Sequence, residues 1–138
     1  MVWPIVKNIF AVVLGVVAAI CIIFLIQAIS NSLYPPPPDL DFDDINAVRA
    51  HVQSVPLFGK LLVLLSYAAG CLAGGAVAGI ANRRSLMPAL IVGGLMTFGV
   101  IMNLIAIPHP AWFAIASVVV CLPAAVIGAR GLRQLIPG

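Results

Sequence analysis

The chain has 138 residues, of which 63% are hydrophobic and 8% are charged, and its formal net charge is +3. Because soluble domains carry about 25% charged residues, this composition excludes an ordinary soluble globular protein. The basic residues form no cluster of the kind that binds nucleic acid. We therefore expect the chain to lie in a lipid bilayer, and the bilayer is the partner that the composition predicts.

Four apolar runs are long enough to cross a bilayer, which takes roughly 20 residues of helix. They cover about residues 9–29, 61–81, 86–107 and 111–129. Backbone polar groups in lipid must be paired within their own segment, so each run is predicted to be a helix. The predicted fold is all-α: one transmembrane domain over residues 1–138, built as an integral membrane four-helix bundle.

The first run has a possible signal-peptide cleavage site at Ala28-Ile29-Ser30. Its apolar core, however, is longer than the roughly 7–15 residues of a secretory signal. We therefore expect a retained helix. Orientation follows from Lys and Arg, which concentrate in cytoplasmic flanks. With both termini inside, most basic residues lie in the cytoplasm, namely Lys7, Arg83, Arg84, Arg130 and Arg133. This N-in/C-in topology leaves Arg49, Lys60 and the loop 31–58 outside.

The outer loop combines a proline run with a short amphipathic segment. Residues 34–38 read YPPPP, a sequence that favours polyproline II and suits either a spacer or a docking strip for a partner. Residues 41–52 are predicted to form a surface helix with Asp41 as N-cap. We expect this helix to act as a lid over the outer ends of the spans, with contacts from Phe42, Ile45, Val48, Val52, His109 and Trp112.

Glycines recur on both sides of the turn 82–85. Folding residues 70–99 into a helical hairpin would place Gly74 opposite Gly94 and Gly75 opposite Gly93, at equal depths. Small residues let helices in lipid approach closely. The sequence therefore predicts a seam between the second and third spans, formed by Gly70, Gly74, Gly75, Gly93, Gly94 and Gly99.

Polar side chains within the spans gather in the outer half of the predicted topology. They are Gln27, Ser66, Tyr67, Asn103 and Ser117. Two interpretations stay open: hydrogen bonds that join the helices, or a small polar cavity that opens to the outside.

No Asp, Glu, Lys or Arg falls inside a span, which argues against proton-coupled pumps and cation exchangers. Cys21, Cys71 and Cys121 lie at similar depths, but thiols in such positions are usually apolar fillers. We expect no metal site and no cofactor. The chain also has no nucleophile–base pair or phosphate loop, so no enzyme activity is predicted.

Several of these segments resemble one group of proteins. The YPPPP loop, the Gly74-Gly75 pair, the PHPAWF turn at 108–113 and the run Leu122–Ala125 are together similar to small four-span proteins of the bacterial inner membrane. That resemblance implies a bacterial inner-membrane location and no particular chemistry.

The features of the sequence favour a small non-enzymatic membrane protein that packs against itself or against a larger membrane assembly. The alternative is an oligomeric pore or carrier for a neutral solute that uses the outer polar residues. The two are told apart by whether those side chains face one lumen or separate helix contacts.

Overall fold

The computed structural model describes residues 2–107 and 109–136. Its helices, in chain order, are α1 (Val2–Leu33), α2 (Ile45–Ser54), α3 (Leu57–Ala81), α4 (Met87–Ala106) and α5 (Ala111–Leu135). All except α2 are long and apolar enough to cross a membrane. The predicted all-α, four-helix membrane bundle is confirmed. Residue 108 of the predicted turn, and the ends of the predicted domain at 1 and 137–138, lie outside the described residues.

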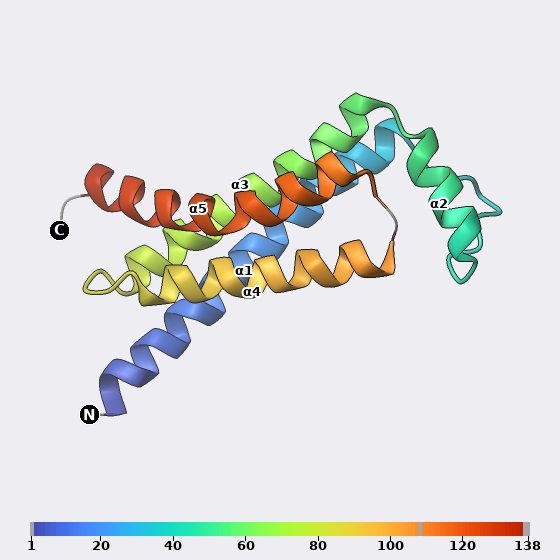
Figure 1. The fold of residues 1–138 in the computed structure, drawn as a ribbon. Coiled ribbons are helices and arrows are strands. Elements are labelled where there is room, and N and C mark those ends of the chain that lie inside the picture. Colours follow the sequence, from blue (N-terminus) through green and yellow to red (C-terminus); the bar gives the residue numbers. More distant parts are fainter. Residues whose placement is uncertain (1, 108, 137–138) are drawn as a thin grey trace.

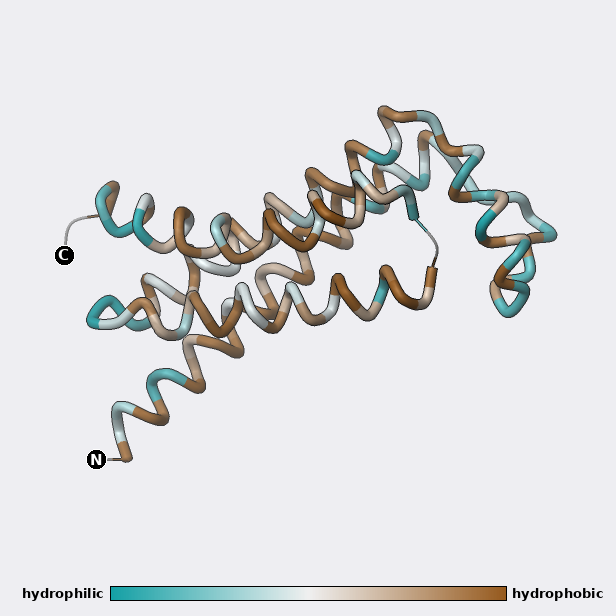
Figure 2. Tube along the Cα trace, in the orientation of Figure 1, coloured by the Kyte–Doolittle hydropathy of each residue, from teal (hydrophilic) through white to brown (hydrophobic). Residues whose placement is uncertain are grey.

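The bundle has two distinct ends. Both termini and the α3–α4 turn lie at one, here called the terminal end, and α2 lies beyond the other, here called the α2 end (Figure 1). Hydrophobic residues fill the middle of the long helices, whereas hydrophilic residues gather at both ends (Figure 2). This banding is the pattern expected of a bundle whose middle faces lipid.

Two of the long helices extend well beyond the apolar runs in the sequence. The first run was predicted at 9–29, but α1 has 32 residues and includes Lys7 and Asn8. The fourth was predicted at 111–129, but α5 continues to Leu135. A helix does not need to stop where the hydrocarbon ends, because its hydrogen bonds are internal. At about 1.5 Å per residue, α1 exceeds the roughly 30 Å hydrocarbon core and must tilt or protrude.

Helix α3 is central and packs against α1, α4 and α5. One face of α3 meets α1 through small residues. A Cβ on Gly74 would lie 2.7 Å from the carbonyl oxygen of Gly15, and a Cβ on Gly15 would lie 2.7 Å from that of Gly74. A Cβ on Gly70 would lie 2.9 Å from the carbonyl oxygen of Ala19. The backbones of α1 and α3 are therefore in direct contact.

A second face of α3 meets α5, which runs parallel to it (Figure 1). A Cβ on Gly75 would collide with the backbone of Ala125, and one on Gly79 would lie 2.8 Å from the Cα of Ala129. Both pairs are separated by the same number of residues, as parallel helices in register require. Because successive residues are about 100° apart around a helix, Gly74 and Gly75 serve different neighbours.

The predicted glycine seam between the second and third spans is wrong in its pairing. Gly70 and Gly74 face α1, whereas Gly75 faces α5, as does Gly93, whose Cβ would lie 2.9 Å from a side-chain carbon of Leu122. Gly94 and Gly99 are exposed, and a Cβ on either would meet nothing within 4 Å. The depths were consistent with the pairing, but depth does not define the direction in which a residue points around its helix.

Candidate functional site

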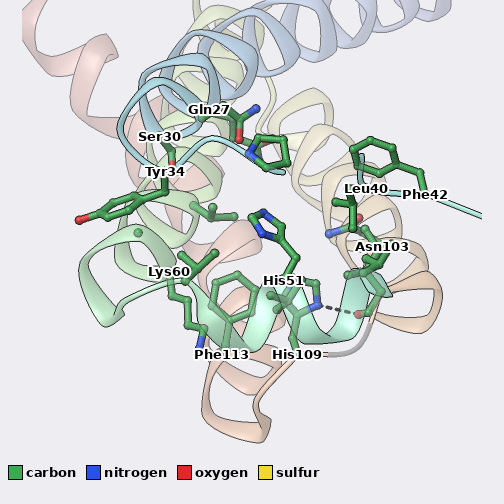
Figure 3. A pocket seen from close by; sticks show the side chains of 18 of the residues that line it. Gln27, Ser30, Tyr34, Leu40, Phe42, His51, Lys60, Asn103, His109 and Phe113 are labelled. Carbon is green, nitrogen blue, oxygen red and sulfur yellow. Dashed lines mark hydrogen bonds between the residues drawn. The ribbon is translucent and has the colours of Figure 1, made fainter. Parts of the chain in front are cut away.

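A cavity lined by both polar and apolar side chains lies at the α2 end. It has a volume of about 310 Å³ and is bordered by α2, by the loop before it and by the ends of the long helices (Figure 3). Its lining includes polar groups from five segments, namely α1, α2, α3, α4 and the α4–α5 turn: Gln27, His51, Lys60, Tyr67, Asn103 and His109. This volume is at the lower end of the range for small-molecule pockets, about 300–1,000 Å³. We call this space the α2-end cavity.

The floor of the α2-end cavity is a hydrogen-bond network that joins α1, α3 and α4. The Gln27 amide nitrogen donates to the Ser66 hydroxyl at 3.3 Å, and the Asn103 amide nitrogen donates to the Tyr67 hydroxyl at 3.1 Å. Ser66 in turn donates to the carbonyl oxygen of Val63 at 2.5 Å. Each hydrogen bond across helices in lipid contributes about 0.6 kcal/mol on average, so the floor also holds the helices together.

The predicted polar cluster is therefore brought together in part. Gln27, Tyr67 and Asn103 line the α2-end cavity. Ser66 is fully buried behind Gln27. Ser117, on α5, is also fully buried, and its hydroxyl oxygen has no hydrogen-bond partner among the described residues. The same amides and phenol join the helices and face the cavity, so the two interpretations of this cluster do not exclude each other.

A tight core closes the α2-end cavity beneath its floor. Tyr67 packs in one cluster with Cys71, Val100, Phe113 and Cys121, all of them buried. The rings of Tyr67 and Phe113 are tilted by 57° with their centroids 6.4 Å apart. Tyr67 and Phe113 also line the cavity, so this close-packed cluster bounds it on that side. Within the described residues, the cavity is a recess that ends at this cluster.

Apart from His51, the wall that α2 and its C-terminal flank form is apolar. Val48, Val52 and Val55 line the α2-end cavity, and Val48 is only 8% exposed. Phe42 also lines the cavity, although its side chain is 72% exposed. The predicted lid therefore exists as a cavity wall. It does not rest directly on the ends of the spans.

Two predicted lid contacts are wrong. Ile45 is 49% exposed and does not line the α2-end cavity. Trp112 is 43% exposed and meets the edge of Phe113 instead of α2. The helix also begins later than predicted. Asp44 is the N-cap and accepts from the backbone nitrogens of residues 46 and 47, whereas Asp41 accepts from that of residue 43 in a separate turn. The later start changes which side chains face the cavity.

The mouth of the α2-end cavity carries Lys60 from α3, His51 from α2 and His109 from the α4–α5 turn. The His109 ring stacks on Phe113, with centroids 4.9 Å apart and planes 13° apart, and its Nδ1 lies 2.6 Å from the carbonyl oxygen of Ile107. Burial lowers the pKa of His109, and the charge of Lys60 lowers it further, while the bond to Ile107 acts in the opposite direction. The net effect favours the neutral form of the His109 ring.

The terminal end holds a second polar cluster that the sequence did not reveal. Arg133 donates to the carbonyl oxygens of Gly79, Asn82 and Ser85, at 3.0, 2.7 and 2.5 Å. Asn82 also donates to the side chain of Asn8 at 2.5 Å. One guanidinium thereby satisfies the carbonyls at the end of α3 and in the following turn. These bonds tie α5 to the end of α3 and to the α3–α4 turn, which is a structural role.

The cysteines do not converge on one point. Cys21 is exposed on α1, whereas Cys71 and Cys121 are buried in the core between α3 and α5. Among the described residues, no group of three or more His, Cys, Asp or Glu side chains is placed to hold a metal ion.

Comparison with known proteins adds no relative from which a function could be transferred. No family model matches the chain, and no curated protein or solved structure does so either.

Proposed function

We propose that this protein is a non-catalytic integral membrane protein that binds a small molecule in the α2-end cavity. The observation that carries the proposal is the convergence of Gln27, Tyr67 and Asn103, from three different helices, on one cavity with an apolar wall. A recess with apolar walls and a few convergent polar groups is the usual form of a small-molecule site. The proposal is for binding alone and includes no reaction.

The closed floor favours binding over conduction. A pore through a single chain would have to pass the buried cluster that contains Tyr67, Phe113 and Cys121. A carrier would have to open the same cluster during each cycle. The neutral-solute carrier that the sequence left open therefore requires a rearrangement, whereas binding requires none.

We also propose an orientation and a location. The terminal end carries Lys7, Arg83, Arg84, Arg130 and Arg133 and no acidic residue, whereas every Asp of the chain lies in the loop at the α2 end. Positive residues concentrate on the cytoplasmic side, so the α2-end cavity would open away from the cytoplasm. The resemblance noted above supports a bacterial inner membrane as the proposed location.

Native mass spectrometry of the full chain, released from the producing membranes in a neutral detergent, tests the proposal. The wild type is expected to carry a small-molecule adduct. Val52→Trp, which fills the cavity from α2, is expected to lose it, and Ile45→Trp, on the exposed face of the same helix, is expected to keep it. A wild type without an adduct, or an adduct retained in both variants, would contradict the proposal.

A second candidate is the accessory role favoured by the sequence, in which the chain packs against itself or another membrane protein. The observation in its favour is that Gly94 lies exposed on α4 with nothing within 4 Å of its Cβ position. A partner helix can approach closely at such a position. Gly94→Leu should then leave the bundle folded but abolish co-purification of a partner chain. Unchanged co-purification would count against this surface.

A further inference from the structure

We propose that the ligand of the α2-end cavity is a small amphipathic anion, with a carboxylate or phosphate group held at the mouth by Lys60 and His109. The inference rests on the proposed function, since it names the chemistry of the molecule bound there. It goes beyond the neutral solute that the sequence left open.

The charge of the lining favours an anion. Lys60 is only partly exposed and faces the α2-end cavity, and no Asp or Glu is among the described residues that line it. Asp44 caps its own helix, and Asp41 closes the turn before it. Lys60 is thus a cation at a half-buried position without a carboxylate partner in the described structure. An anionic group in the mouth would supply the missing counter-charge.

The His109 ring is held in one orientation, which determines the nitrogen atom that can contact an anionic group. The carbonyl oxygen of Ile107 can only accept a hydrogen bond, so Nδ1 of His109 carries the proton there. Stacking on Phe113 fixes the plane of the ring. Nε2 is then the atom left to meet a ligand. It becomes a second positive donor beside Lys60 once the ring is protonated.

The floor and walls favour an apolar body behind the anionic group. Lys60 and Tyr67 are seven residues apart on α3, so the mouth lies about 10 Å from the floor. Between them the cavity is walled by Val48, Val52 and Val63. The side chains of Gln27, Asn103 and Tyr67 at the floor already form hydrogen bonds within the protein. The part of the ligand that meets them therefore does not need to be charged. An acyl chain or a similar hydrocarbon fits this space.

Binding should take up a proton. The other titratable groups that line the α2-end cavity are Lys60 and Tyr67 from α3, His51 from α2, and Tyr34, which follows α1. Desolvation and Lys60 keep the pKa of free His109 below its ordinary value, and a bound anion would raise it. Affinity for an anion is therefore expected to increase as the pH falls from 8 toward 5.5, whereas affinity for a neutral analogue is not.

Calorimetric titration of the full chain in phosphatidylcholine nanodiscs tests the inference, with decanoate as the anion and decanol as its neutral analogue. Lys60→Met removes the charge but keeps an apolar stem. Arg49→Met is the matched control, because Arg49 is exposed on α2 at the same end and does not line the cavity. A charge-assisted hydrogen bond corresponds to about a tenfold change in affinity or more.

We expect decanoate to bind the wild type, to bind Lys60→Met at least about tenfold more weakly, and to bind Arg49→Met within about twofold. Decanol should bind all three proteins alike, which also verifies that the variant cavity is intact. Displacement of decanoate by phosphatidylglycerol would assign the anion to a lipid headgroup, and resistance to displacement would assign it to a free acid. Either outcome supports an anion site.

Equal binding of decanoate and decanol, unaffected by Lys60→Met, would overturn the anion inference while leaving the cavity a small-molecule site. Failure of both probes to bind would also overturn it. In that case the native-mass experiment, which does not depend on these probes, decides the proposed function separately.

Discussion

Gly75 is one of the residues at which two helix backbones touch. A Cβ there would collide with Ala125, whereas a Cβ on Gly94 would meet nothing within 4 Å. Gly75→Ala is therefore expected to destabilise the bundle by about 1–3 kcal/mol, the usual cost of overpacking. Gly94→Ala is the matched control and should be neutral or slightly stabilising, because alanine favours helix over glycine. Denaturant unfolding in micelles measures both, and equal losses would contradict the α3–α5 contact.

Single residues also show the limit of prediction from sequence. The types and depths of Gln27, Tyr67 and Asn103 could be predicted, because depth follows from position along a span. The stacking of His109 on Phe113 and the triple carbonyl contact of Arg133 could not, since each depends on how distant segments meet. Proline neighbours indicated only that His109 lies in a turn.

Among the elements, α2 is the one whose stability depends most on the rest of the molecule. A helix of 10 residues is marginal in water, so burial of Val48 against the cavity must help to hold it. Val48→Asp is expected to cost about 1.5–3 kcal/mol of local stability, raising amide exchange in α2 roughly tenfold or more. Ile45→Asp, at a position 49% exposed, should change exchange little. Faster exchange for Ile45→Asp than for Val48→Asp would refute this placement of α2.

The existence of each element was predictable, but its partners were not. Apolar runs of membrane-spanning length required helices, and the period of residues 41–52 indicated the short helix. The cap was misplaced because Asp41, Asp43 and Asp44 are all residues that favour an N-cap. The seam was misplaced because neighbouring glycines such as Gly93 and Gly94 point in directions about 100° apart, and only packing decides which of them faces inward.

The whole molecule has a strong asymmetry of charge along the bundle. The terminal end carries five basic residues and no acidic residue: Lys7, Arg83, Arg84, Arg130 and Arg133. Cysteine introduced at Asp43 should therefore react with an impermeant thiol reagent in intact cells, and cysteine at Arg84 should not. Labelling at position 84 without labelling at 43 would invert the proposed orientation.

The central claim is a cavity that opens at the α2 end and is closed beneath its floor. Accessibility of introduced cysteines to a small water-soluble thiol reagent tests it most directly, in the full chain with the exposed Cys21 replaced by alanine and the buried Cys71 and Cys121 kept, so that the core stays filled. Cysteines at Val63 and Asn103, which line the cavity, should react, and a cysteine at Val100, in the core below, should not. Reaction at position 100, or at none of the three, would contradict the account.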